Sequence, residues 1–283
     1  MKPQQPDIHT YYNNTRFDYS AVWNRRRSDV AVHFGYYDDR AGRHAEALDN
    51  MNRALADLAG IQPGERVLDA GCGLGNACFW LAEHRQAQVT GINIVASQIA
   101  DCQKRAAQKA SPRIEFIQAD FCHIPFPENA FDVVWACESV CHAEEKAAFY
   151  KEAFRVLKPG GRLVMAEYMR TARLVSPEGE ELLSAWLRPW AIPDIDTADE
   201  HRTHALAAGF QQIEMRDVTP NVRVSLRNLH EVSLRWLPVG KFLHLFGLVN
   251  DIRLGNAIAS VRQYEALQVG AWMYGMLEAN KAR

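Results

Sequence analysis

The sequence lacks the cysteine patterns of a zinc-binding or disulfide-stabilised protein. Six cysteines occur among its 283 residues, and none of them forms a C-x-x-C pair or the Cys/His spacing of a structural zinc site. We therefore expect free thiols and a reducing cytoplasm. The chain also has no uninterrupted apolar run of about 18 residues and no apolar N-terminal stretch typical of secretory signals. These absences argue against a membrane-spanning or secreted protein and predict a cytoplasmic one.

The sequence also has no excess of positive or negative charge. Lys and Arg number 32 against 34 Asp and Glu, which gives a formal net charge of -2. This balance produces no overall field that would attract nucleic acid or an anionic membrane. The proportions of hydrophobic residues (48%) and charged residues (23%) are those of an ordinary globular protein. We expect neither a nucleic-acid partner nor stable membrane insertion, and the sequence leaves homo-oligomerisation open.

Strand-like and helix-like segments alternate along much of the chain. The runs at 66–71, 88–94 and 131–137 are typical of short buried strands, and they are separated by helix-like runs such as 76–83 and 96–110. Alternation of this kind predicts parallel strands joined by right-handed crossovers. The fold class is therefore α/β, with a doubly wound sheet.

Aromatic-rich segments are expected to cover this sheet. Residues 1–41 form an N-terminal lid segment in this interpretation, and residues 42–283 form the main domain. Within that domain the alternation breaks at 171–200 and at 220–264, where Trp, Pro, Leu and Phe are frequent. We interpret these two stretches as mainly helical cover insertions.

A glycine-rich loop follows the first expected strand. The segment VLDAGCGLG places Gly71, Gly73 and Gly75 between a strand and a helix, where missing side chains let a ligand approach the backbone. The G-x-G-x-G spacing differs from the G-x-G-x-x-G of a dinucleotide site. Asp69 at the strand end would repel a pyrophosphate, but it can pair with an ammonium group. These features favour an amino-acid-bearing nucleoside over NAD.

This loop and the later blocks QADF, FDVVWACES and VLKPGGRL resemble the class I S-adenosylmethionine-dependent methyltransferases. The resemblance implies a mainly parallel seven-stranded sheet of the Rossmann-like methyltransferase fold. It also implies the cofactor S-adenosyl-L-methionine and the product S-adenosyl-L-homocysteine.

The same resemblance assigns roles to residues of the cofactor site. Asp69 and the loop are expected to hold the methionyl and ribosyl parts. Asn93 and Gln98 are expected at the ribose, and Asp120 and Phe121 at the adenine. Asn93 stands where the family usually has Asp or Glu, which removes the charge-assisted strength of that contact. The full set of expected cofactor residues is Tyr19, His33, Asp69, Gly71, Cys72, Gly73, Asn93, Ile94, Gln98, Asp120, Phe121 and Cys137.

Within the family, the sequence is similar to the small-molecule branch that includes sterol, tocopherol and other isoprenoid methyltransferases. The segments HFGYYD and GINIVASQI and the motif CESVCHA carry this similarity. In this branch an aromatic N-terminal segment folds over the cofactor, which implies that role for Tyr19, His33 and Tyr36. The similarity implies a lipophilic small-molecule acceptor, with carbon methylation of an isoprenoid as the first hypothesis.

Candidate catalytic residues come from the chemistry of methyl transfer. An alkene attacks a sulfonium methyl group without prior deprotonation, and it leaves a carbocation that needs aromatic faces and a base. Glu138 and His142, four residues apart, are expected on one helical face. Glu138 would act as cation stabiliser or base, and His142 as its partner or as the proton acceptor. Tyr36 is the third candidate. The expected pocket wall consists of Trp23, Tyr36, Trp186 and Trp190.

Arginines at 25–27 and at 223, 227 and 235 support a more specific hypothesis about the acceptor. A guanidinium fork would bind the diphosphate of a prenyl diphosphate, and a divalent metal would assist only in that case. No D-D-x-x-D motif is present to hold such a metal, so we predict no metal ligand. A solvated face is the simpler interpretation of these arginines.

Two other functions stay open at this point. Oxygen or nitrogen methylation of a natural product would use His142 as the base for the acceptor proton. A chain that kept the glycine loop but lost turnover would only bind the cofactor, although an aromatic cover favours an enzyme. Methylation of nucleic acid is disfavoured because CESV stands where that group has an N/D-P-P-Y/F block.

Overall fold

The computed structural model describes residues 6–17 and 31–283 of the chain. Within them one sheet contains seven strands, β1 (Arg66–Ala70), β2 (Gln88–Asn93), β3 (Ile114–Gln118), β4 (Phe131–Cys137), β5 (Leu157–Arg170), β6 (Gln211–Asp217) and β7 (Trp272–Asn280).

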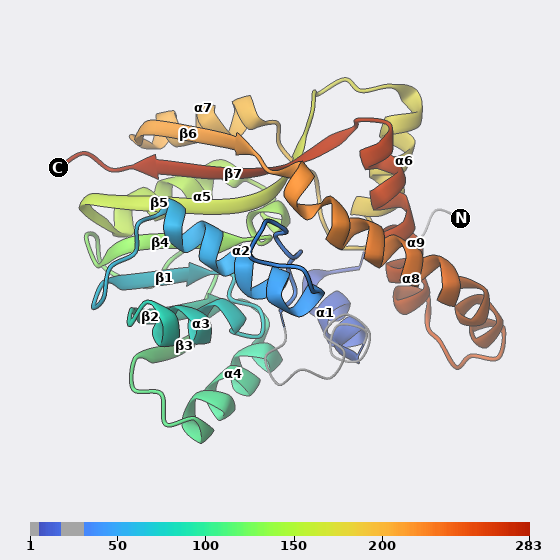
Figure 1. Ribbon diagram of the computed structural model, residues 1–283, viewed down its shortest axis with the longest axis horizontal. Helices are drawn as coiled ribbons and strands as arrows, with labels where there is room; N and C mark the ends of the chain where they lie inside the picture. Colours follow the sequence, from blue (N-terminus) through green and yellow to red (C-terminus); the bar gives the residue numbers. More distant parts are fainter. Residues whose placement is uncertain (1–5, 18–30) are drawn as a thin grey trace.

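The strands lie in the order β3-β2-β1-β4-β5-β7-β6 (Figure 1). Neighbours among β1 to β5 pair in parallel, whereas β7 runs antiparallel to both β5 and β6. The predicted mainly parallel, seven-stranded sheet is confirmed. The chain moves outward from β1 to β3 and then returns to the other side of β1, so the order reverses between β1 and β4. In open α/β sheets, ligands bind at the carboxyl ends of the strands beside such a reversal.

Helices cover both faces of the sheet. They are α2 (His44–Leu58), α3 (Asn76–His84), α4 (Ala96–Gln108), α5 (Lys146–Val156) and α7 (Ala198–Ala208). Side chains of a strand point alternately to opposite faces. Accordingly Val133 of β4 packs in one hydrophobic core with α2, α3 and α4, and Val134 packs in a second core with α5 and α7. Burial on both faces explains why the strands read as continuous apolar runs in the sequence.

A second group of helices lies beyond the carboxyl ends of the parallel strands (Figure 1). It consists of α1 (Ile8–Phe17), α6 (Pro177–Leu187), α8 (Thr219–Leu245) and α9 (Asp251–Gln268). Helix α9 is packed against α1, α6 and α8. The sequence did not predict α1, which the Tyr11 hydroxyl attaches to α9 by donating to Asn256 Oδ1 (2.9 Å). Among the described helices, none is both long and apolar enough to cross a bilayer.

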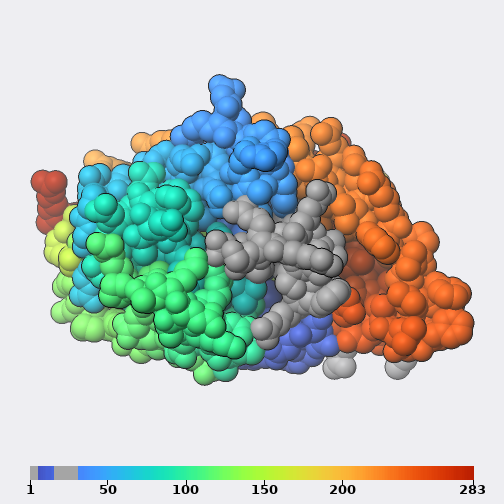
Figure 2. Space-filling model, turned by 60° about the horizontal axis from the view of Figure 1, so that its bottom comes forward, coloured from blue at the N-terminus to red at the C-terminus, as the bar shows by residue number. Residues whose placement is uncertain are grey.

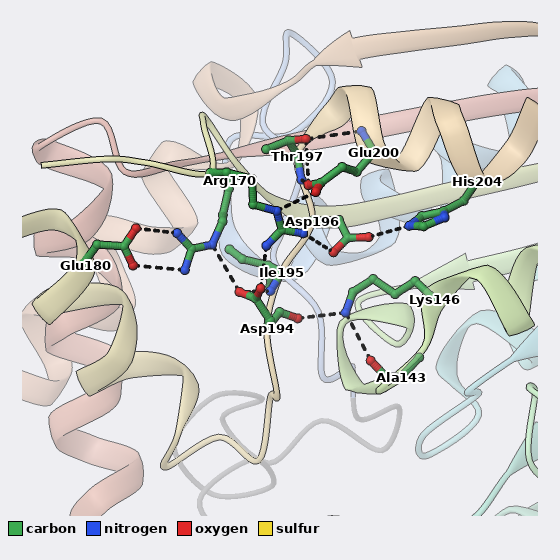
Figure 3. A network of polar contacts seen from close by, with 11 residues as sticks. Ala143, Lys146, Arg170, Glu180, Asp194, Ile195, Asp196, Thr197, Glu200 and His204 are labelled. Atoms are coloured by element: carbon green, nitrogen blue, oxygen red, sulfur yellow. Dashed lines mark hydrogen bonds and ion pairs between the residues drawn. The ribbon is translucent and has the colours of Figure 1, made fainter.

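A polar network attaches the segment between α6 and α7 to the sheet (Figure 3). Arg170 at the end of β5 donates two parallel hydrogen bonds to the Glu180 carboxylate (2.7 and 3.1 Å) and a third to Asp194 Oδ1 (3.1 Å). The Lys146 ammonium joins the same segment to the start of α5 by donating to the carbonyl oxygens of Ala143 (3.1 Å) and Asp194 (2.9 Å). These bonds hold residues 188–197 over the strand ends.

Replacing Arg170 by Ala is expected to lower the free energy of unfolding by about 2 kcal/mol. Its side chain is only 11% exposed, and its hydrogen bonds are to charged groups, which are stronger than neutral ones. Arg216→Ala is the matched control, because the Arg216–Glu214 pair is exposed and such pairs contribute about 0–1 kcal/mol. Denaturant unfolding of both variants measures the difference, and equal losses would contradict a structural role for the network.

Candidate active site

The glycine-rich loop connects β1 to α3 at the reversal of strand order. Gly71 has a φ of +89°, and a Cβ at this position would lie 2.4 Å from Cβ of Ser139. Only glycine fits a backbone with this conformation and this close a neighbour. The N–H groups of Gly71 and Cys72 both donate to the Ile92 carbonyl near the end of β2 (2.9 and 3.0 Å). The loop is therefore a fixed turn that brings the ends of β1, β2 and β4 together.

Asp69 lies at the end of β1 with only 2% of its surface exposed. Its carboxylate accepts one hydrogen bond from a side chain, the thiol of Cys78 at 3.1 Å. Burial raises the pKa of Asp69 to about 7. A thiol is a weak donor and carries no charge, so it offsets little of the cost of burying a carboxylate. An ammonium group at this place would be strongly stabilised.

Asn93 and Gln98 form a hydrogen-bonded pair at the end of β2. The Asn93 amide donates to Gln98 Oε1 (2.7 Å), and its Oδ1 accepts from the Val95 N–H (3.1 Å). Both side chains are buried and line the cavity described below. These hydrogen bonds orient both amides before a ligand binds. The pair carries no charge, unlike the acidic residue that the family usually has at position 93.

Asp120 and Phe121 follow β3 and line the same cavity. Asp120 accepts from the Cys122 N–H (2.8 Å) and contacts His123 Nδ1 (3.2 Å). The Phe121 ring packs edge-to-face on Phe149, with centroids 5.6 Å apart. A carboxylate acceptor next to a fixed aromatic ring suits a purine with an exocyclic amine.

The other expected cofactor residues line the cavity, with the exception of Tyr19. His33, Gly71, Cys72, Gly73, Ile94 and Cys137 all line it. Tyr19 lies outside the described residues, as does Trp23 of the expected pocket wall.

Tyr36 is not among the residues that line the cavity. Its backbone N–H donates to the Ala47 carbonyl (2.8 Å), which aligns this segment with α2. The charged groups that influence its hydroxyl are Asp38, Arg40 and Arg216. The catalytic role of Tyr36 stays a prediction, and Phe34, two residues earlier, lines the cavity.

Glu138 is a half-buried carboxylate directly after β4. It accepts hydrogen bonds from the Phe34 N–H (2.7 Å), the Tyr274 hydroxyl (2.7 Å) and the Tyr168 hydroxyl. The rings of Phe34, Tyr168 and Tyr274 also contact one another edge-to-face, with centroids 5.8 to 6.3 Å apart. Burial raises the pKa of Glu138 to about 8, although these three donors act in the opposite direction. A carboxylate surrounded by aromatic rings is an environment that favours a cation.

His142 is held in one neutral tautomer. Its Nδ1 lies 3.2 Å from the Ala191 carbonyl, which only accepts hydrogen bonds, so this nitrogen carries the proton. Its Nε2 then accepts from the Tyr12 hydroxyl at 3.0 Å. Burial lowers the pKa of His142 to about 4.

The expectation that Glu138 and His142 share one helical face is wrong. Glu138 has a φ of +51°, and it precedes the short 3-10 helix η2 (Val140–His142) instead of lying in a helix. Both side chains nevertheless line one cavity. Their partners Tyr12, Tyr168 and Tyr274 were missed, because no local motif marks a tyrosine that comes from a distant segment.

The cavity has a volume of about 930 Å³ and extends from the glycine loop to the second group of helices. Its outer wall is largely apolar and includes Trp190, Ile192, Leu229, Val232, Val239, Leu243 and Leu254. Trp190 therefore lies where it was predicted, whereas Trp186 is fully buried and packs behind Trp190 with ring centroids 6.0 Å apart.

The described residues do not form the arginine fork that was the more specific hypothesis for the acceptor site. Arg223, Arg227 and Arg235 are exposed on α8 and are not part of the lining, and 25–27 lie outside the described residues. Among the described residues that line the cavity, Arg253 of α9 is the one arginine. All six cysteines are free thiols, and the described chain holds no group of three or more His, Cys, Asp or Glu side chains suited to a metal ion.

Comparison with known proteins agrees with this geometry. A family model described as "Methyltransferase domain" matches residues 68–165. The 27-O-demethylrifamycin SV methyltransferase of Amycolatopsis mediterranei is 31% identical over 75% of this chain and 80% of the relative. A sterol 24-C-methyltransferase of Pneumocystis carinii is 28% identical over 95% of this chain and 70% of the relative.

Solved structures include one that matches nearly the whole chain. The [4+2]-cyclase SpnF has a TM-score of 0.79 and 25% identity, with 99% of this chain and 98% of SpnF covered. The fold and the site thus define an enzyme that transfers a methyl group to a small molecule. The chain belongs to the class I S-adenosylmethionine-dependent methyltransferases, in the branch that acts on small molecules.

The cofactor of this protein is accordingly S-adenosyl-L-methionine. The residues of the site fit this cofactor, because the buried Asp69 carboxylate is suited to the ammonium group of a methionyl tail. Asn93 and Gln98 would hold the ribose, and Asp120 and Phe121 the adenine.

Removal of the Asp69 carboxylate (Asp69→Ala) is expected to weaken cofactor binding about tenfold or more, the usual effect of losing a charge-assisted hydrogen bond. In the unmodified protein, affinity should fall as the pH drops below about 7, because the carboxyl group must lose its proton to pair with an ammonium group.

Calorimetric titrations between mildly acidic and neutral pH test both statements. Asp69→Asn should remove the pH dependence, and Asp199→Asn, at an exposed position of α7, should leave it unchanged. A wild-type affinity that is constant across this range would contradict the assignment.

Proposed function

We propose that this protein methylates a carbon atom of a lipophilic isoprenoid acceptor. The observation that carries the proposal is the arrangement of Glu138, a half-buried carboxylate fixed by two tyrosine hydroxyls and one backbone N–H beside three aromatic rings. When bound, the cofactor supplies a methyl group on a positively charged sulfur.

The residues around Glu138 suit the charge that carbon methylation develops. The π electrons of the acceptor form the new bond to the methyl carbon, while the carbon–sulfur bond breaks and its electron pair stays on sulfur. The acceptor is left as a carbocation, which the faces of nearby aromatic rings stabilise. A proton then leaves the neighbouring carbon, and its bonding pair closes a new double bond. The Glu138 carboxylate takes this proton, and its raised pKa makes it a stronger base than an ordinary glutamate.

The positioning residues determine where this base lies. Phe34, Tyr168 and Tyr274 come from three separate segments, and each fixes the carboxylate with a hydrogen bond. Positioning contributes a large part of the acceleration in reactions of this type.

The cavity lining favours a neutral acceptor over a prenyl diphosphate. Its described charged residues include Arg253 but also five carboxylates, Asp69, Asp120, Glu138, Glu144 and Glu145, which would repel a diphosphate. Apolar side chains from the segment after α6 and from α8 and α9 suit a hydrocarbon skeleton. The similarity to a sterol 24-C-methyltransferase supports an acceptor of this kind.

Oxygen methylation is the second candidate, and the contact between Tyr12 and His142 favours it. The neutral imidazole offers Nε2 as an acceptor toward a hydroxyl group inside the cavity. An acceptor hydroxyl in place of that of Tyr12 would give its proton to this nitrogen as the methyl group is transferred. The similarity to the 27-O-demethylrifamycin SV methyltransferase is consistent with this reaction.

Exchange of the proposed base (Glu138→Gln) should lower turnover about 100-fold or more, since general-base catalysis contributes about that much, and it should weaken cofactor binding less than Asp69→Ala does. Incubation with a panel of sterols, isoprenoid quinols and phenols, and with methyl-labelled cofactor, measures turnover and the position of the label. Glu144→Gln, at an exposed glutamate of the same cavity, is the control and should keep full activity.

Carbon methylation predicts that His142→Gln retains most activity and that the label is found on carbon. Oxygen methylation predicts the opposite result. If His142→Gln is inactive, Glu138→Gln is active and the label is found on oxygen, the second proposal replaces the first.

A further inference from the structure

The distal half of α8 and its connection to α9 expose large apolar side chains. Phe242 is 59% exposed, Leu245 81% and Phe246 66%. Figure 2 shows this part of the chain, in orange, projecting at one end of the molecule. We call the following residues the apolar tip: Leu234, Trp236, Val239, Phe242, Leu245, Phe246 and Leu248. Exposed apolar surface of this extent marks a place where a protein contacts another apolar body.

The apolar tip is continuous with the cavity. Trp236 and Val239 are exposed to solvent, and both also line the cavity. One turn further along α8, Leu243 lines the cavity, while its neighbour Phe242 faces solvent. The rim of the cavity and the apolar tip are therefore built from the same stretch of α8.

The charges within the apolar tip itself are positive. Between positions 232 and 250 the sequence contains Arg235 and Lys241 but no Asp or Glu. Glu231 and Asp251 border this stretch, and the Arg235 guanidinium lies 3.5 Å from the Glu231 carboxylate, which leaves Lys241 as the cation that no carboxylate of the tip faces. Both cations are exposed, and Arg253 follows in the first turn of α9. Apolar and aromatic side chains flanked by Lys and Arg are typical of surfaces that lie in the interface of a membrane with anionic lipids.

We propose that the apolar tip docks reversibly on an anionic membrane surface and that the acceptor enters the cavity from there. The inference rests on the proposed function in one respect, since only a lipophilic acceptor would be collected from a membrane. Docking would be interfacial, because none of the described helices can cross a bilayer. A second copy of the chain is the competing occupant, and the test below separates it from a membrane surface.

Co-sedimentation with vesicles tests the proposal without any acceptor, so that its outcome is independent of the methylation reaction. The protein is expected to sediment with vesicles of phosphatidylcholine and phosphatidylglycerol, and to do so less with phosphatidylcholine alone or at high salt. Combined Phe242→Ser, Leu245→Ser and Phe246→Ser substitutions should reduce the bound fraction about tenfold or more. Arg235→Glu with Lys241→Glu should abolish the preference for the anionic vesicles.

The matched control is Leu174→Ser with Leu206→Ser, which removes two exposed leucines far along the chain from the apolar tip. This variant should sediment as the wild type does. Circular dichroism and thermal unfolding establish that each variant is folded, which is expected because the replaced side chains are exposed.

Three results would overturn the proposal. The first is a wild-type protein that stays in the supernatant with both kinds of vesicle. The second is a triple-serine variant that sediments like the wild type. The third is a lipid-free dimer in sedimentation velocity that the triple-serine variant abolishes, which would assign the apolar tip to a second copy.

Discussion

The enclosure of two carboxylates at adjacent strand ends is the constraint on which the site depends. Asp69, near the end of β1, is buried, and Glu138, directly after β4, is half-buried, on either side of the reversal in strand order. Among the described residues neither forms an ion pair, and burial raises the pKa of both. An uncompensated buried carboxylate is unfavourable, and such groups are usually neutralised, paired or reserved for a ligand. Here both line a cavity that receives a cofactor with two positive groups, one on nitrogen and one on sulfur.

The remainder of the structure encloses these carboxylates and holds them in position. Phe34 and the tyrosines of β5 and β7 fix Glu138, and the glycine loop leaves the end of β1 accessible. The ion-pair network around Arg170 holds the segment after α6, whose Ala191 carbonyl sets the tautomer of His142. The cover helices therefore contribute to the chemistry as well as to the enclosure of the acceptor.

Local patterns in the sequence predicted the features that depend on neighbouring residues. The buried strands and the glycine turn with Asp69 follow from periodicity and from short motifs. The resemblance to the family supplied the expected cofactor residues, most of which line the cavity. What the sequence did not reveal depends on long-range packing. Tyr12 meets His142 from 130 positions away, and Tyr274 meets Glu138 from 136 positions away. The backbone hydrogen bond of Tyr36 to Ala47, which aligns its segment with α2, is a tertiary contact of the same kind.

Proton release on cofactor binding tests the central claim most directly. The raised pKa values leave Asp69 about half protonated and Glu138 mostly protonated in the free protein near pH 7, so binding of a ligand with an ammonium and a sulfonium group must expel protons. Calorimetry in buffers of different ionisation enthalpy should show release of about one proton per S-adenosyl-L-methionine bound near pH 7. S-adenosyl-L-homocysteine, which lacks the sulfonium charge, should release fewer. Binding of both ligands without any change in protonation would contradict the account.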